Sequence, residues 1–337
     1  MARYLIKRLL LAVFTLFVIL LVSYVLLRLA PGDPTRSSMF GSDAAGSALD
    51  ASKGALVRNN SMREKLHLDR PVLVGFGCWL ADVVLRGDFG TSAAVDPGRP
   101  VTDLILARLP VTVSLNFWAV VVTYLCAIPL GVYAAVHADG WFDRGSAFIL
   151  FLLYSLPVMW VGLLLQSTLA EGGTWPVFPL KGVTGADSEP MSTWRYQLEI
   201  LRCYTLPIFC LAYGGFAGLS RYARGSMLEV IHSDYIRTAR AKGVPESAII
   251  WKHAFRNALI TLITLFGGLL PSLVAGSVLV EYIFNIPGMG SLSLLALSSR
   301  DYPLQMALFA FAGMLTLAGI LISDLLYLAA DPRIKLT

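Results

Sequence analysis

The side chains best suited to chemistry in this sequence gather in one short stretch, residues 233–257. It reads SDYIRTARAKGVPESAIIWKHAFRN and lies between two long apolar runs. Elsewhere the four histidines are dispersed, and no G-x-x-x-x-G-K-[ST], H-E-x-x-H or nucleophile-elbow motif occurs. The sequence therefore predicts no nucleotide-binding loop, no catalytic centre, no metal site and no cofactor. The polar side chains of residues 233–257 are better suited to binding another protein.

Two short helices joined by a turn are expected in this stretch. Ser233 or Asp234 can cap the first helix, and Gly243 suits the left-handed conformation that ends it. Pro245 fits the first turn of the second helix, and Glu246 lies next to the positive end of that helix. The second helix carries apolar and polar residues, namely Ile249, Ile250, Phe255 and Ala258 together with Lys252, His253 and Arg256.

The composition indicates a polytopic membrane protein. Of 337 residues, 56% are hydrophobic and 15% are charged, and the mean hydropathy is +0.67. Soluble domains carry about a quarter charged residues. A net charge of +5 is compatible with nucleic-acid binding, but no basic run is interleaved with aromatic residues, so no nucleic-acid partner is predicted. The four cysteines show no C-x-x-C spacing and are interpreted as packing residues.

Six uncharged runs are long enough to cross a membrane. The first is 9–27, and the others are 109–136, 145–170, 203–220, 257–280 and 302–323. Each can span about 30 Å of hydrocarbon as a helix. The short run 203–220 is expected to continue helically through Arg221 and Arg224, whose long stems reach the interface. Six spans place both termini on one side.

The distribution of Lys and Arg predicts which side is cytoplasmic. With a cytoplasmic N-terminus, the inner segments 1–8, 137–144, 221–256 and 331–337 hold 13 Lys or Arg in 59 residues. The outer loops 171–202 and 281–301 hold four in 53. Cytoplasmic loops carry the excess of positive charge, so the stretch 233–257 is predicted to face the cytoplasm.

The long polar segment 28–108 is expected to combine a loop with helices. Residues 41–56 are rich in Gly, Ser, Ala and Asp and predict a mobile loop. From Pro71 onward, apolar residues recur at helical spacing, namely Val72, Phe76, Trp79, Leu80 and Val83. This pattern predicts an amphipathic helix that lies at the outer interface or packs on the helix bundle. A second such piece, leading into the membrane, is expected over 101–109.

Glycines and prolines within the apolar runs predict packing sites and kinks. Gly214 and Gly218 are expected to allow close helix packing, an interpretation favoured over a gating hinge. Pro157 is expected to kink its span, with Ser155 helping to satisfy the freed backbone groups. Asn116 either faces a transport pathway or makes an interhelical hydrogen bond.

The last outer loop is bounded by Glu281 and Asp301 and contains NIPGMG. Its turn residues predict an ordered re-entrant or gate-like segment, with Pro287, Gly288 and Gly290 as candidate gate residues; the alternative is a plain connector. The aromatic loop 171–202 is expected to form an interfacial cap, with docking of a binding protein as one possibility.

Nine stretches carry a resemblance to a known family. They are RLAPGDP (28–34), RGDFGTS (86–92), LPVTVSL (109–115), SLPVMWVGLLL (155–165), DYIRTARAKG (234–243), HAFRNAL (253–259), NIPGMGSL (285–292), RDYPL (300–304) and DLLYLAADPRI (324–334). Together they resemble the permease subunits of ABC importers, in the oligopeptide, dipeptide and nickel branch. The family's Glu-Ala-Ala-x-x-x-Gly docking motif corresponds here to Arg237, Thr238, Ala239 and Gly243, without the Glu and the first Ala. Thr261 stands where the branch commonly has Pro.

The resemblance implies an all-α fold with six transmembrane helices and the type I ABC importer architecture. Residues 1–30 would form the first helix with a cytoplasmic N-terminus, and 31–108 an extracytoplasmic region with amphipathic helices. Residues 109–330 would form the permease core of five transmembrane helices, including the cytoplasmic coupling loop 233–257, and 331–337 a cytoplasmic tail. The location implied is the bacterial inner membrane.

The same resemblance implies function and partners. The chain would be the permease of an ATP-driven importer for di- and oligopeptides, working with a second similar permease, two ATPase subunits and an extracytoplasmic solute-binding protein. Alternatives are a permease for nickel chelates or another solute, an ATPase-independent secondary transporter, and a membrane-embedded enzyme. The expected ATPase-coupling residues are Asp234, Tyr235, Arg237, Thr238, Ala239, Arg240, Lys242, Gly243, Pro245, Glu246, Lys252, His253 and Arg256.

Overall fold

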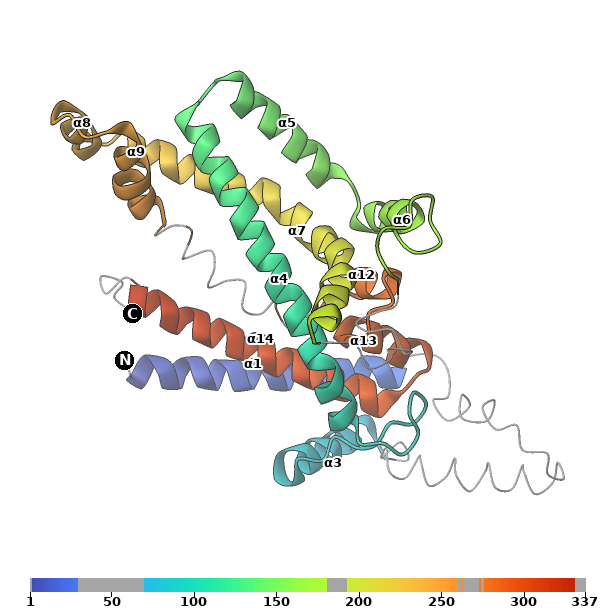
Figure 1. The fold of residues 1–337 in the computed structure, drawn as a ribbon. Helices are drawn as coiled ribbons and strands as arrows, with labels where there is room; N and C mark the ends of the chain where they lie inside the picture. The colour runs from blue at the N-terminus through green and yellow to red at the C-terminus, as the bar shows by residue number, and fades with distance from the viewer. Residues whose placement is uncertain are drawn as a thin grey trace. The chain divides into compact units, whose positions relative to one another are not determined.

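The computed structural model describes residues 2–29, 70–180, 193–259, 262, 273 and 276–330. Within these ranges the chain is helical, and the only β-structure consists of two isolated bridges, Thr91 with Pro100 and Ala170 with Phe178 (Figure 1). The described residues of Met1–Pro110 and Leu292–Ala318 form one compact unit, and those of Val111–Ser291 and Gly319–Lys335 form a second. The predicted loop 41–56, the predicted tail 331–337 and Thr261 lie outside the described residues.

In the first unit, α1 (Ala2–Leu29) packs against α3 (Val72–Ala81). The ring of Phe76 lies 5.6 Å from those of Phe17 and Tyr24. The helix predicted from Pro71 is thus confirmed. It packs on another helix, which was one of its two predicted positions. After Ala81 the helix widens into the π-helix η2 (Asp82–Arg86), which the sequence pattern did not predict.

In the second unit, long helices surround an apolar core. The helices are α4 (Val101–Val136), which belongs to this unit from Val111 onward, α5 (Trp141–Ser155), α6 (Val158–Leu169) and α7 (Thr193–Ile231). The 36 residues of α4 extend about 54 Å at 1.5 Å per residue, which exceeds the hydrocarbon thickness. Residues 101–109 are therefore the first turns of a continuous helix rather than a separate piece. The long helix α5 packs along α7, and α6 packs on α7 and α12 (Val278–Ile283) (Figure 1).

The apolar run 145–170 is divided into two helices, α5 and α6, and its assignment as a single span stays a prediction. The axes of α5 and α6 are bent by 92°. Pro157 occupies the position before α6, and Leu156 is extended, as the residue before a proline prefers. The carbonyl of Leu156 accepts a hydrogen bond of 2.8 Å from the Tyr213 hydroxyl. The predicted disruption at Pro157 is confirmed, and α7 satisfies a backbone group that the break exposes.

The helix predicted to continue past residue 220 is confirmed by α7, which includes Arg221 and Arg224. The Arg224 guanidinium donates two hydrogen bonds, of 2.7 and 2.6 Å, to the two carboxylate oxygens of Asp143 at the start of α5. Because Asp143 is only 5% exposed, this ion pair fixes the ends of α5 and α7 together. Residues 193–202, predicted as part of an outer loop, instead begin α7.

Four helices of the described residues are long and apolar enough to cross a membrane, or five if α5 and α6 count as one span. The four are within α1, α4, α7 and α14 (Tyr302–Ala330). The predicted run 257–280, with Gly267 and Gly268, lies mostly outside the described residues. The count of six spans stays a prediction.

Helices α4 and α7 approach each other most closely at glycines other than the predicted pair. A Cβ atom on Gly131 would lie 2.7 Å from the Cβ of Ala223, and one on Gly215 would lie 2.9 Å from the Thr123 side chain. No described atom lies within 4 Å of a Cβ placed on Gly214 or Gly218. Among the described residues, Gly131 and Gly215 are the glycines at the contact of α4 with α7, and the packing role of Gly214 and Gly218 stays a prediction.

Replacing Gly131 with Ala should destabilise the second unit by about 1–3 kcal/mol, because the added methyl group overlaps the backbone carbonyl of Ser220 and the side chain of Ala223. Thermal denaturation of the detergent-solubilised protein, followed by size-exclusion fluorescence, measures this loss. Gly214→Ala is the matched control, because it adds the same methyl group in open space. Equal stabilities of the two variants would contradict the proposed contact between α4 and α7.

Candidate functional site

The stretch 233–257, here called the polar segment, begins with the helix α8 (Asp234–Ala241). Ser233 is the N-cap residue, as predicted, and its backbone is extended. Its hydroxyl does not cap the helix but donates to the carbonyl of Val230 at 2.6 Å. The carbonyl of Ser233 accepts hydrogen bonds from the N–H groups of Ile236 and Arg237 and so starts the helical ladder.

Gly243 ends α8 in the left-handed conformation, with φ of 74°, as predicted. Its N–H donates to the carbonyl of Arg240 at 2.9 Å, and the N–H of Val244 donates to that of Ala239 at 3.3 Å. These two bonds form a Schellman motif, in which the residues flanking the turn also share an apolar contact. Val244 and Ala239 accordingly pack on the same apolar cluster.

The second half of the polar segment departs from a regular α-helix. Pro245 is the N-cap residue of α9 (Glu246–Ala248) and lies just before the first turn rather than in it. The chain then continues as the π-helix η3 (Ile249–Ala254), where an α-helix was expected. Glu246 occupies the first turn, as predicted, near the positive end of the helix dipole.

An apolar cluster fixes the polar segment to the long helices of the second unit. Ile236 of α8 and Ile249 of η3 are 0% and 1% exposed. They pack with Val132 of α4 and Met227 of α7, both of which are also buried. The polar segment is therefore packed directly against α4 and α7, without intervening residues.

The opposite face of the polar segment is polar and largely exposed. Most of the predicted coupling residues are exposed, namely Asp234, Tyr235, Arg237, Thr238, Arg240, Lys242, Gly243, Pro245, Glu246, Lys252 and Arg256, while Ala239 and His253 are half-buried. Five Arg or Lys side chains and two carboxylates give this segment a positive charge. The arrangement, apolar toward the helices and cationic outward, suits a complementary surface on another protein.

Ion pairs order part of this exposed face. Arg240 donates to Glu246 at 2.6 Å across the Gly243 turn, and Arg237 lies 3.6 Å from Asp234 within α8. The hydrogen bond from Arg240 lowers the pKa of the Glu246 carboxyl below its ordinary value. Asn257 also donates a hydrogen bond to the Tyr235 hydroxyl and joins the two ends of the segment.

The candidate gate residues fall into two groups. Gly288 and Gly290 are buried beside α12 and the start of α13 (Met289–Ser298), next to the half-buried Pro287. Asn116, on α4, donates a hydrogen bond of 2.9 Å to the carbonyl of Leu273. This bond supports the structural alternative for Asn116.

Ser155 and Pro157 form the second group, at the break between α5 and α6. The Ser155 hydroxyl donates to the carbonyl of Phe151 at 2.8 Å, and both side chains are exposed in this chain. Their neighbours Leu156 and Val158 pack on the apolar cluster that contains Ile283 and Ile286. The break is therefore connected to α12 through packing.

Two buried carboxyl groups bound the NIPGMG segment, defined here as residues 281–301. Glu281 and Asp301 are both 0% exposed. The Oδ2 atom of Asp301 accepts hydrogen bonds from the Ser92 hydroxyl and from the N–H groups of Ala93, Ala94 and Val95. Sequence reasoning named both residues as loop boundaries but did not predict their burial. The Asp301 contacts join segments about 200 residues apart, so no local spacing indicates them.

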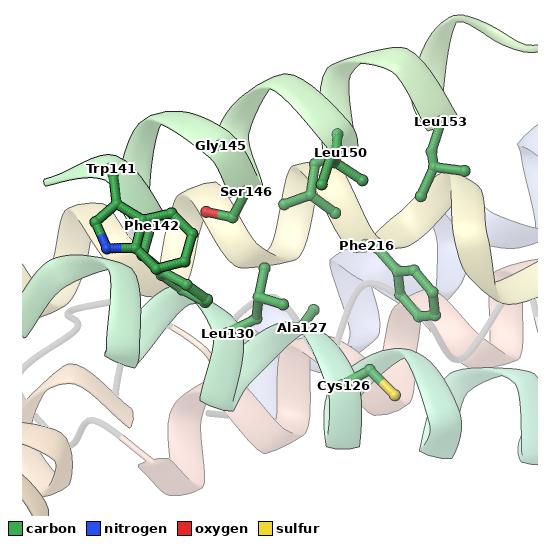
Figure 2. Close-up of a pocket in the computed structure, with 11 residues that line it drawn as sticks. Cys126, Ala127, Leu130, Trp141, Phe142, Gly145, Ser146, Leu150, Leu153 and Phe216 are labelled. Carbon is green, nitrogen blue, oxygen red and sulfur yellow. The ribbon is translucent and has the colours of Figure 1, made fainter. Parts of the chain in front are cut away.

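The second unit also contains an apolar pocket of about 400 Å³ between α4, α5 and α7. Figure 2 shows its lining, which includes Leu130, Phe142, Leu150 and Phe216. The Ser146 hydroxyl at this pocket donates to the carbonyl of Asp143. A peptide backbone needs hydrogen-bond partners when it leaves water. This pocket is therefore unsuited to holding a peptide.

Comparison with known proteins places these features in a family context. The sequence profile described as "Binding-protein-dependent transport system inner membrane component" matches residues 127–336, and the profile of the N-terminal part of such membrane components matches residues 1–116. The oligopeptide transport system permease protein AppB of Bacillus subtilis is 39% identical over 335 residues, which cover 99% of this chain and 100% of AppB.

Two further relatives match over almost the same length. A putative peptide transport system permease protein of Brucella abortus is 35% identical and covers 99% of each chain. The inner membrane ABC transporter permease protein YejB of Escherichia coli O157:H7 is 33% identical and also covers 99% of each chain. The similarity therefore extends over the whole sequence, including the polar segment and the NIPGMG segment.

Replacing Arg240 with Gln should raise the pKa of Glu246 toward the ordinary glutamate value, because the guanidinium donors are lost. At pH values above the ordinary glutamate pKa, the Arg240–Glu246 pair stabilises the turn fully. This stabilisation is lost as the pH falls through the lowered pKa of Glu246. Infrared titration of the protein with isotope-labelled glutamate carboxyl groups measures the shift. Arg237→Gln, which removes the partner of Asp234, is the control. An unchanged Glu246 pKa in Arg240→Gln would contradict the pairing.

Proposed function

The chain belongs to the family of inner membrane components of binding-protein-dependent transport systems, and on this basis we propose that its polar segment docks on the ATP-hydrolysing subunits. The chain is a permease subunit of an ABC importer and is embedded in the membrane by several apolar helices. Through this docking contact, conformational changes of the ATPase subunits would be transmitted to the membrane helices.

One observation carries the proposal: the polar segment is anchored on one side and exposed on the other. Ile236 and Ile249 bury their side chains against α4 and α7, whereas the cationic face, including Arg237, Arg240 and Lys252, is exposed. A partner that binds the exposed face can thus move the membrane helices without contacting them. The residues that would contact the ATPase are the thirteen coupling residues predicted from the sequence.

The mechanism that follows is alternating access driven by ATP. Nucleotide binding closes the ATPase pair and displaces the docked polar segment, and α4 and α7 follow because they share its apolar cluster. The nucleotide shifts the permease equilibrium only by its differential affinity for the two conformations. In this scheme the NIPGMG segment, with Pro287, Gly288 and Gly290, serves as a gate on the opposite side of the membrane from the polar segment.

The assembly that we propose contains a second similar permease, two ATPase subunits and an extracytoplasmic solute-binding protein. The excess of Lys and Arg in the segments 1–8, 137–144 and 221–256 supports cytoplasmic termini and a cytoplasmic polar segment. Residues 31–108 would then be extracytoplasmic, and 109–330 would form the permease core. Solute would pass between the two permeases.

We propose peptides as the transported solutes, because relatives such as AppB are named as oligopeptide or peptide transport permeases. The test measures ligand binding to the solute-binding protein of the proposed assembly, using a mixture of di- to pentapeptides and, separately, nickel with chelators. Binding of peptides, followed by their ATP-dependent uptake into proteoliposomes, is the expected result. Binding of the nickel chelate alone would replace the peptide assignment.

Replacing Gly243 with Val should uncouple ATP hydrolysis from transport while leaving membrane insertion intact. The left-handed conformation costs a residue with a side chain about 1–2 kcal/mol, so the turn between α8 and α9 would rearrange. The measurement is substrate-stimulated ATPase activity together with uptake, in proteoliposomes that contain the complete complex.

Gly98→Val is the matched control for this experiment. Gly98 has φ of 90° and open space around a Cβ position, but it lies outside both the polar segment and the loop 171–202. This variant should therefore have the same free-energy cost of a left-handed valine, while ATP hydrolysis stays coupled to transport. Full substrate-stimulated activity in Gly243→Val would contradict the docking role, and an active carrier without any ATPase would contradict the whole scheme.

A further inference from the structure

Glu281 is a fully buried carboxyl group enclosed by glycine backbone. A Cβ atom on Gly288 would lie 2.5 Å from Oε2 of Glu281, and one on Gly290 would lie 3.0 Å from the same oxygen. A Cβ atom on Gly276 would lie 3.0 Å from Oε1. The distance at Gly288 is too short for a side chain, and those at Gly276 and Gly290 are tighter than most Cβ contacts, so the three glycines form a cavity shaped to one carboxyl group.

Hydrogen bonds from two elements converge on this carboxyl group. Oε2 accepts from the N–H of Ser291 at 2.8 Å, in the first turn of α13. Oε1 accepts from the hydroxyl of Thr112 on α4 at 3.0 Å, and the hydroxyl oxygen accepts from the N–H of Met289 at 2.8 Å. Glu281 and Thr112 together satisfy two N–H groups at the start of α13 that have no partner within the helix.

Glu281 also fixes the turn that precedes α13. Its main-chain carbonyl accepts from the N–H of Ile286 at 2.8 Å, and Asn285 takes the left-handed conformation with φ of 52°. This is the bonding pattern of a Schellman motif at the end of α12. Glu281 therefore holds the start of the turn through its main-chain carbonyl and the residues after the turn through its side chain.

We propose that Glu281 is the positioning residue of the gate, and that it locks the turn 285–290 and the start of α13 to Thr112 of α4 as one rigid cap. This inference rests on the proposed role of the NIPGMG segment as a gate and assigns the contact that seals it. The gate then opens by movement of α4 relative to its surroundings, with the cap attached, rather than by unfolding of the loop. A plain connector would not need a buried carboxyl group, three glycines and a partner on another helix.

The experiment measures leakage through the resting complex. Complexes of equal monodispersity on size exclusion are reconstituted into proteoliposomes that contain carboxyfluorescein, without ATP and without binding protein. Thr112→Val keeps the side-chain shape but removes the hydroxyl, and Glu281→Gln keeps the shape but turns one acceptor into a donor that faces Ser291 or Thr112. Each variant should increase the rate of dye release per complex about tenfold, the factor expected for losing one hydrogen bond to a buried carboxyl group.

Three further variants make the result specific. Thr112→Ser retains the hydroxyl and should restore the low leak rate. The double variant Glu281→Gln with Thr112→Val should leak no faster than the leakier single variant, because both changes break the same lock. Glu171→Gln, at an exposed glutamate of the same unit, should leave the leak rate unchanged.

The possible outcomes distinguish a failure of the positioning role of Glu281 from a failure of the proposed ATPase docking. Leak rates at the level of the unsubstituted complex in both Thr112→Val and Glu281→Gln would overturn the positioning role, whatever the effect on yield. Additive leak rates in the double variant would overturn the shared lock. The dye assay needs neither ATP nor a known substrate, so a failure of ATPase docking appears only in the Gly243→Val experiment.

Discussion

The burial of Ile236 and Ile249 against α4 and α7 is the interaction on which the rest of this structure depends. Short helices rarely persist alone in water, because forming the first turn costs more than it returns. Here the short helices α8 and η3 share one apolar cluster with the long helices α4 and α7. The exposed face can therefore be largely polar without loss of order, although the segment also exposes Trp251, and its charges remain available to a partner.

Much of this arrangement could be predicted from the sequence, because local rules govern it. Gly243 and Pro157 have the conformational roles that their residue types favour, Ser233 is the N-cap residue of α8, and the long apolar runs within the described residues form helices. The two π-helices could not be predicted, since Asp82–Arg86 and Ile249–Ala254 have ordinary helical composition. The same is true of the 92° bend, whose angle is set by packing on α7 and α12 rather than by the proline alone.

Contacts between residues far apart in the sequence are the main features that could not be predicted. The pairs Asp143–Arg224 and Glu281–Thr112 join residues that are 81 and 169 positions apart. The charge count treated Arg224 only as a marker of membrane side, although its charge is matched by a buried carboxylate. Likewise Gly214 and Gly218 had the spacing of a packing motif, but the actual contacts of α7 with α4 lie at Gly215 and opposite Gly131. Spacing identifies a helix face, and only the tertiary structure identifies what lies against it.

Helix α4 carries Thr112 toward one end and Val132 toward the other, 20 residues and so about 30 Å apart. A single rod therefore joins the cap beside the NIPGMG segment to the cluster beneath the polar segment, without a chain of side chains between them. Such a connection acts equally in both directions. Under the proposed scheme, in which a nucleotide-binding partner displaces the polar segment and a solute displaces the cap, each ligand alters the affinity for the other by the same factor.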